Sequence, residues 1–342
     1  MVGVLEGTSN RSKGAGQLMN MAVLIALAAG AASAMMFASI VSGALISLLL
    51  FYLAPLPLIV AAIAWGPLGA AIGGIAAAIG LGLAFGLPYC IAFLVMVALP
   101  AWWLGHLALL GRPINEAPLS GDGTLRAPPT LEWYPVGRIL LWTAGFAALT
   151  TMATLLTLGT DAATIISTMQ HGLQRVFGSI DTNSSTEDEQ WINALVNIAP
   201  AAAAVVTTLT MTVSLWLAGK VTATSGRLRR PWPDLRSTTL PNMTLVALSV
   251  AIAFCFSGGL LAMLAQAVAA ALIMAYALIG FAVLHTLTME LKSRSVWLSF
   301  AYTIVFIFSW TLLLMAALGL ADAVFGFRQR YLRSRPPPLP VS

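Results

Sequence analysis

The side chains that could do chemistry within the apolar stretches of this sequence are neutral and polar. Asn193 and Asn197 lie one helical turn apart, and Thr208 follows them in the same apolar stretch. Gln266 stands between two later apolar stretches. Amides and hydroxyls both donate and accept hydrogen bonds, so these four residues are predicted to bind an uncharged ligand. The alternative is that they form hydrogen bonds between helices.

The sequence contains no residues that can be recognised as catalytic. The sequence contains no HExxH, GxSxG or Walker A motif, and its three histidines, His106, His171 and His285, are far apart. No Asp, Glu, Lys or Arg falls near the middle of an expected span, which removes the usual relay for proton or ion coupling. We therefore predict no catalytic residue, no metal site and no cofactor, and a protein that is not an enzyme.

The composition decides the class of protein. Hydrophobic residues make up 59% of the 342 residues and charged residues only 8%, against about 25% charged residues in a typical soluble domain. The mean hydropathy is +0.90. The few charges cannot cover a soluble surface, so the lipid bilayer is the expected surrounding. The sequence predicts an all-α, polytopic transmembrane helix bundle of about 8–10 spans that does not bind nucleic acid.

Nine stretches are long and apolar enough to cross a membrane, since a span needs about 20 mainly apolar residues. They are 21–41, 44–65, 69–85, 88–110, 139–158, 192–217, 243–265, 267–288 and 296–318. Ala54 and Pro55 interrupt the second stretch, where proline is expected to kink the helix. Such a kink can line a ligand site or serve packing alone.

The distribution of Lys and Arg predicts orientation, because basic loops stay in the cytoplasm. The predicted transmembrane domain, 21–327, follows a cytoplasmic segment, 1–20, and has two basic cytoplasmic loops, 111–138 and 219–241. The acidic loop 159–190 is expected to face outward. This arrangement favours a bacterial inner-membrane protein with its N-terminus in the cytoplasm.

The basic, proline-rich tail 328–342 conflicts with nine full crossings, which would place it outside. Two alternatives remove the conflict. Either the last stretch folds into a short hairpin that turns near Ser309, or one of the two preceding helices does not cross fully. Both give an even number of crossings and a cytoplasmic tail.

An amphipathic helix is predicted over 161–180 in the outward loop. Ile165, Met169 and Leu173 recur at helical spacing on one face, and Asp161 is positioned to cap the N-terminus. A helix of this kind lies in the membrane interface. It is either a lid over an outward-facing pocket or an anchor for a long loop.

Two apolar motifs resemble a known family. The string Leu53-Ala54-Pro55-Leu56-Pro57-Leu58 precedes Trp65-Gly66 and a glycine-rich span, and Leu318-Gly319-Leu320-Ala321-Asp322 leads to Phe327-Arg328. They resemble the YybS-like family of bacterial multi-pass membrane proteins, a domain of unknown function. That family is similar in helical layout to the substrate-binding components of energy-coupling-factor vitamin transporters, although this sequence has about three more spans.

The resemblance implies two kinds of partner. Energy-coupling-factor components bind a small vitamin and dock a membrane protein through small residues of the first helix, which match Ala22, Ala26 and Gly30. The resulting hypothesis is a small-molecule binding or transport component with its pocket beneath the 161–180 helix. The alternative is a non-catalytic scaffold that docks partners through the basic loops and the tail.

Overall fold

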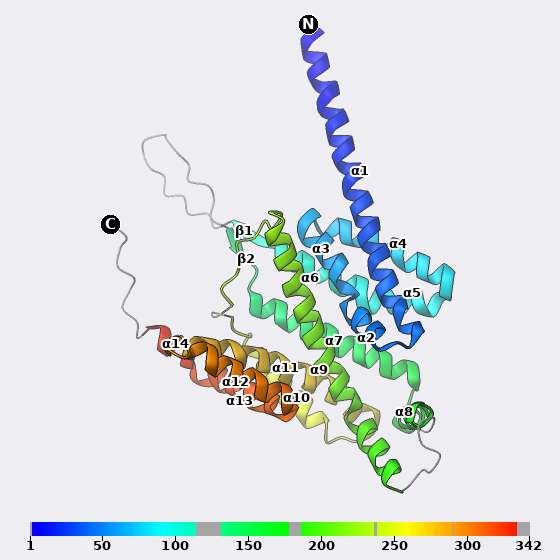
Figure 1. Cartoon of the computed structure of the whole chain (residues 1–342), viewed down its shortest axis with the longest axis vertical. Coiled ribbons are helices and arrows are strands. Elements are labelled where there is room, and N and C mark those ends of the chain that lie inside the picture. Colours follow the sequence, from blue (N-terminus) through cyan, green and yellow to red (C-terminus); the bar gives the residue numbers. More distant parts are fainter. Residues whose placement is uncertain (1, 114–130, 178–185, 236–237, 290, 334–342) are drawn as a thin grey trace. The chain divides into compact units, whose positions relative to one another are not determined.

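The computed structural model describes residues 2–113, 131–177, 186–235, 238–289 and 291–333. Contacts between residues divide the chain into two units. Unit 1 comprises Met1–Pro135 and Thr210–Pro233, and unit 2 comprises Val136–Leu209 and Asp234–Ser342. Helices form almost all of both units (Figure 1), which confirms the predicted all-α bundle.

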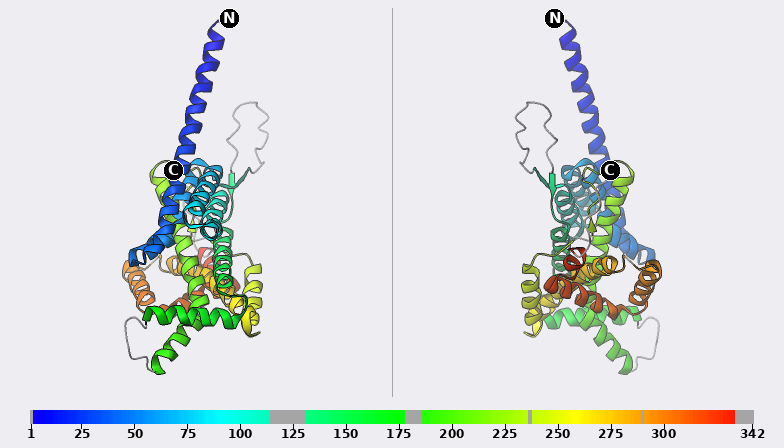
Figure 2. Two further views of the ribbon diagram at one scale, coloured as in Figure 1. Left: turned by 90° about the vertical axis from the view of Figure 1, so that its right-hand side faces the viewer. Right: turned by 90° about the vertical axis from the view of Figure 1, so that its left-hand side faces the viewer.

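Unit 1 is built from helices and one small sheet. They are α1 (Val2–Ala38), η1 (Ser39–Ser42), α2 (Leu45–Leu53), α3 (Pro55–Trp65), α4 (Pro67–Phe85), α5 (Leu87–Phe93), the π-helical turn η2 (Leu94–Ala98), α6 (Leu99–Leu109), β1 (Gly111–Pro113) and β2 (Leu131–Trp133). α1 is one continuous helix, drawn in dark blue (Figure 2). The antiparallel β1–β2 pair, in which Arg112 faces Glu132, lies within a predicted loop.

The expected break in the second span occurs at Ala54, between α2 and α3. Pro55 opens α3 at a position where its missing N–H costs nothing. Ala54, Leu58 and Ile59 are fully buried in the hydrophobic core of unit 1. The break therefore lies in apolar packing, which favours the second of the two interpretations of this kink.

Glycine brings α1 and α4 into backbone contact. A Cβ added to Gly30 would overlap the carbonyl oxygen of Gly73, and one added to Gly73 would overlap that of Ala26. Small residues at such positions allow helices to approach closely within lipid. The small-residue face of α1 therefore packs against α4 of the same chain.

Unit 2 contains α7 (Val136–Leu158), α8 (Ala162–Phe177), α10 (Met243–Phe254), α11 (Gly259–Leu287), α12 (Arg294–Ile307), η4 (Ser309–Thr311), α13 (Leu312–Phe325) and α14 (Phe327–Arg333). The long helix α9 (Thr186–Thr224) belongs to unit 2 up to Leu209 and to unit 1 from Thr210. The core of unit 2 surrounds α11, which packs against α7, α10 and α13.

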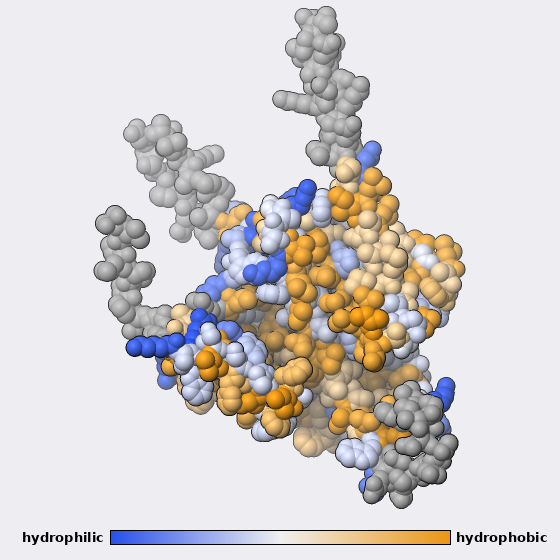
Figure 3. Space-filling view, in the orientation of Figure 1, coloured by the Kyte–Doolittle hydropathy of each residue, from blue (hydrophilic) through white to orange (hydrophobic). Residues whose placement is uncertain are grey.

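The span count lies at or just below the lower end of the expected 8–10. Among the described residues, seven helices are long and apolar enough to cross a membrane, or eight if α12 and α13 together form one span. Apolar side chains cover much of the surface drawn in Figure 3, where lipid would contact them. Over the described residues, the most exposed apolar side chains include Leu45, Leu83 and Phe256, each at least 85% exposed.

The predicted seventh and eighth spans, 243–265 and 267–288, are wrong in their boundary. α10 ends at Phe254, and α11 runs unbroken through Gln266. The chain turns instead at Gly258 and Gly259, with φ of 79° and 60°, which glycine adopts without strain. A single glutamine does not interrupt a helix, because its side chain leaves the backbone hydrogen bonds intact.

The last apolar stretch, 296–318, turns near Ser309, as the hairpin alternative predicted. α12 and α13 are bent by 118° relative to each other at Phe308 and Ser309, so α13 runs partly back along the direction of α12. Phe306 and Trp310 at the bend are 88% and 63% exposed. α10 has only 12 residues, so the second alternative, an incompletely crossing helix, also has a counterpart in the structure.

Candidate functional site

The junction of α13 and α14 is a tight turn centred on a glycine. α13 ends at Phe325, and Gly326 has φ of 65°, the left-handed conformation typical of a residue that ends a helix. Its N–H donates to the carbonyl oxygen of Asp322 at 2.8 Å. The chain then restarts as α14, which brings Arg328 back beside Asp322 although six positions separate them.

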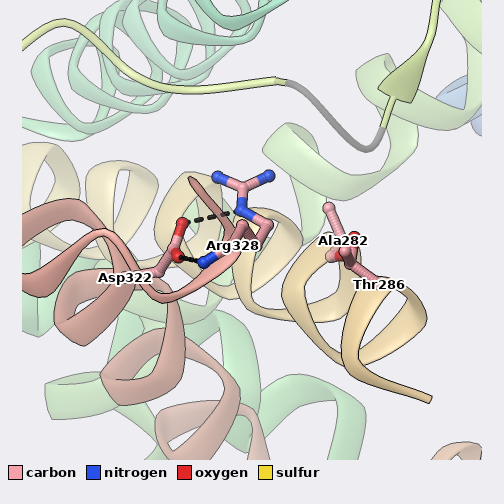
Figure 4. Close-up of polar contacts among 4 residues, drawn as sticks. All are labelled: Ala282, Thr286, Asp322 and Arg328. Carbon is pink, nitrogen blue, oxygen red and sulfur yellow. Dashed lines mark hydrogen bonds and ion pairs between the residues drawn. The ribbon is translucent and has the colours of Figure 1, made fainter. Parts of the chain in front are cut away.

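Asp322 and Arg328 form a buried ion pair (Figure 4). The Nε of Arg328 lies 2.7 Å from Oδ2 of Asp322, and the backbone N–H of Arg328 donates to Oδ1 at 2.9 Å. The two side chains are 5% and 4% exposed. Both carboxylate oxygens are therefore bonded, and the pair carries no net charge.

A cavity of about 480 Å³ lies beside this pair, entirely within unit 2. It is lined by the segment before α10, by α11 and by the α13–α14 junction. The polar lining residues are Thr239, Asn242, Tyr276, Asp322, Arg328 and Gln329. The side chains of Thr239, Asn242 and Gln329 are exposed. They offer hydroxyl and amide groups in a cavity whose one ion pair is neutral.

Tyr276 forms one wall of the cavity and joins two helices. Its hydroxyl lies 2.6 Å from the hydroxyl of Thr244 in α10, and Thr244 donates to the carbonyl oxygen of Pro241. Both side chains are almost fully buried. This bond fixes the start of α10 against the middle of α11.

The four predicted ligand-binding residues lie elsewhere. Asn193 is exposed and accepts a hydrogen bond from Gln170 of α8 at 2.7 Å. Asn197 is exposed, and Gln266 is half-buried in α11. Thr208 is fully buried and donates to Ala204 of its own helix. Fifteen residues of helix separate Asn193 from Thr208, about 22 Å at 1.5 Å per residue, so one small ligand cannot contact both.

Two of the predicted partner-docking residues, Ala26 and Gly30, are buried against α4, whereas Ala22 is half-buried. A membrane partner would have to contact other faces of α1 or displace α4. Docking through these residues stays a prediction from the resemblance. Among the described residues, no group of three or more His, Cys, Asp and Glu could hold a metal ion.

The amphipathic helix forms as predicted over most of its length, as α8. Asp161 caps it by accepting hydrogen bonds from the hydroxyl and the backbone N–H of Thr164. These bonds hold the pKa of the Asp161 carboxyl below its usual range, so the cap is present at neutral pH and is lost as pH falls through that lowered value.

An apolar cluster lies under α8. Its buried members are Ile165 of α8, Leu155 of α7 and Met263 of α11. Ile165 is completely buried. This packing favours the anchor interpretation of the helix over the lid.

A bundle of helices that are long and apolar enough to cross a membrane, with many exposed apolar side chains, defines a multi-pass membrane protein. The sequence agrees, because residues 31–323 match the model of the family described as "Predicted membrane protein (DUF2232)". The chain belongs to this family. No curated protein and no solved structure matches it. The YybS-like label and the similarity to energy-coupling-factor components are not tested by this match and stay predictions.

The site differs from the one that the sequence indicated. In the sequence, Asp322 and Arg328 stand within a motif that carries the resemblance, and no sequence pattern singles out Tyr276. One signal was present, because a lone Asp close to the end of an apolar stretch, followed by Gly and Arg, provides both charges and the turn that pairs them.

Proposed function

We propose that the protein is a small-molecule binding or transport component whose ligand occupies the cavity of unit 2. The observation that carries this proposal is the cavity of about 480 Å³ beside the buried Asp322–Arg328 pair. Cavities of about 300–1,000 Å³ are typical of small-molecule sites. The segment before α10, which lines one side of the cavity, is not helical.

The lining indicates the class of ligand. Because the ion pair is neutral and each oxygen of its carboxylate accepts a hydrogen bond, the cavity favours an uncharged or zwitterionic molecule over an ion. Asn242 and Gln329 offer two amides that both donate and accept, as hydroxyl-rich or amide-containing metabolites require. Tyr276 and Ile279 add an apolar wall.

A thermal-shift experiment on the purified protein with a panel of neutral and zwitterionic metabolites tests the proposal. A ligand present at one hundred times its dissociation constant stabilises the folded state by about 2.7 kcal/mol, which appears as a shift of several degrees in Tm. N242L and Q329L are expected to abolish this shift and to leave the Tm of the free protein nearly unchanged. Asn242 makes no capping bond in α10, so its replacement has little structural cost.

The matched control is N193L, which changes an exposed asparagine at the α8 end of unit 2. It is expected to keep the ligand response. If N193L abolishes the response and N242L does not, the ligand binds near α8 and the cavity assignment is wrong. A panel without any response, combined with a co-purifying protein partner, would favour the scaffold hypothesis.

For localisation, we propose a bacterial inner membrane with the N-terminus in the cytoplasm. The basic segment after α9 and the basic residues Arg328 and Arg330 then lie on the cytoplasmic side, as positive charges prefer. α8 lies on the opposite side. In this arrangement α10 crosses the membrane together with α11, and α12 and α13 form a hairpin that enters the membrane and leaves on the side from which it came.

Labelling single cysteines in oriented vesicles tests the hairpin. In a background lacking Cys90 and Cys255, K292C before α12 and R330C after α13 are expected to react with a membrane-impermeant maleimide from the cytoplasmic side only. Q174C on α8 is the control and reacts from the other side. If K292C and R330C are labelled from opposite sides, α12 and α13 cross the membrane together as one span.

A further inference from the structure

Unit 1 carries a second feature, a group of cations held on tryptophan rings where α9 ends. We call it the cation–aromatic cluster. Its members are Lys220, Arg227, Arg230, Trp65, Trp133, Trp216 and Trp232. They come from α3, β2, α9 and the segment after α9, all within unit 1.

The end of α9 fixes the chain that carries these cations. α9 ends at Thr224, and Gly226 adopts φ of 66°, which reverses the chain. The N–H groups of Arg227 and Leu228 donate to the carbonyl oxygen of Thr222 at 2.9 and 3.1 Å. Leu228 packs on the hydrophobic core of unit 1. The segment therefore follows a defined path along the end of the helix.

Each cation lies over an aromatic face. The Lys220 ammonium is 4.4 Å from the Trp232 ring centroid and 5.8 Å from that of Trp216. The Arg227 guanidinium is 4.7 Å from the Trp65 ring, and that of Arg230 is 6.0 Å from the Trp133 ring. The attraction of a cation to a ring face holds the charge in place without neutralising it.

The cluster carries a net positive charge. Residues 220–235 hold Lys220, Arg227, Arg229 and Arg230 against one acidic residue, Asp234. Within the described part of the chain, the recorded salt bridges join Arg112 to Glu132 and Arg328 to Asp322, and neither involves these four cations. Lys220, Arg227 and Arg229 are exposed, whereas Arg230 is half-buried. An anion can therefore approach the cluster.

Exposed apolar groups lie directly beside the charges. Trp216 and Trp232 are 46% and 42% exposed, and Val221, next to Lys220, is 47% exposed. Trp216 and Val221 lie near the end of an apolar helix long enough to span a membrane, where tryptophan prefers the interface. A molecule that suits this surface has an anionic head and an apolar body.

We propose that the cation–aromatic cluster is a binding site for an anionic phospholipid, whose head group is attracted by the cations of the cluster and whose acyl chains lie along the exposed face of α9. A lipid fits better than a soluble phosphate, because the charges adjoin membrane-exposed apolar surface. Three cations near a membrane surface favour an anionic lipid by on the order of a hundredfold.

Native mass spectrometry of the delipidated full-length protein tests this proposal, with phosphatidylglycerol and phosphatidylethanolamine added separately. We expect a tightly bound phosphatidylglycerol and a preference over phosphatidylethanolamine of at least tenfold. K220Q/R227Q/R230Q is expected to lose the preference. R138Q/K292Q/R330Q removes the same charge from exposed positions in unit 2 and is expected to keep it.

Three outcomes overturn the proposal. The first is an unchanged preference in K220Q/R227Q/R230Q, and the second is an equal loss in the control variant. The third is stabilisation of the delipidated protein by inorganic phosphate to the same extent as by phosphatidylglycerol, which would identify a soluble anion. K220R/R227K/R230K keeps the charges and is expected to keep the preference. In the unmodified protein the preference should fall severalfold as salt is raised, because ions screen exposed charges.

Discussion

Replacing Asp322 by alanine is expected to destabilise the folded protein by about 3–5 kcal/mol, since it leaves the buried Arg328 guanidinium without its carboxylate. The same change removes the acceptor for the Arg328 backbone N–H at the start of α14. SDS titration of the purified protein, with unfolding followed by far-UV circular dichroism, gives the free energy. R330A is the matched control, because Arg330 is an exposed residue of the same helix. Its effect should stay within about 0.5 kcal/mol.

The double variant D322L/R328M separates the loss of the pair from the cost of a buried Arg328 guanidinium that lacks this carboxylate. Replacing both members of a buried pair by apolar residues is often neutral, so D322L/R328M should recover most of the stability that D322A loses. If D322A and R330A have equal effects, the pair does not form in the folded protein. If D322L/R328M is also fully folded but loses the ligand response, the pair serves the cavity more than the fold.

The second large effect is expected for G280L. A Cβ at Gly280 would overlap the carbonyl oxygen of Met315 in α13, and Gly319 meets Tyr276 in the same way. Backbone cannot yield as a flexible side chain can, so α11 and α13 must separate. Overpacking usually costs about 1–3 kcal/mol, and a clash with backbone should lie at or above the upper end of that range.

G145L is the matched control for G280L. Gly145 lies in α7 of the same unit, it is exposed, and a Cβ added there would meet nothing within 4 Å. Both variants carry the same change in helix propensity, so their difference in Tm, read from the loss of monodisperse protein on heating, isolates the clash. Equal Tm values for G280L and G145L would mean that α11 and α13 do not approach as the structure has them.

The first six spans could be predicted from the sequence to within about three residues at nearly every end, because long apolar runs bounded by Gly, Pro or charged residues define them. The division of the chain into helices after Met243 could not be predicted in this way. Hydropathy alone does not distinguish Gln266, which continues a helix, from Gly258-Gly259, where the chain turns before α11 begins. Turn chemistry was the better signal there, because the Ser257-Gly258-Gly259 run permits positive φ.

The cavity was harder to predict. Asp322 and Arg328 are six positions apart, and side chains at this spacing do not contact each other on a regular helix. They meet only because Gly326 reverses the chain. Tyr276 and Thr244 are 32 positions apart and meet through the packing of α10 on α11. Of the neutral polar residues that the sequence favoured, Thr208 bonds to Ala204 of its own helix and Asn193 bonds to Gln170 of α8.

The shortness of α10 has a consequence for how the chain enters the membrane during synthesis. Twelve helical residues extend about 18 Å, well short of a hydrocarbon core of about 30 Å, so α10 alone is a poor substrate for the insertion machinery. α11, with 29 residues, is long enough and supplies the Tyr276 hydroxyl that Thr244 requires. α10 therefore reaches its place only once α11 has left the ribosome, and the two enter the bilayer as a pair.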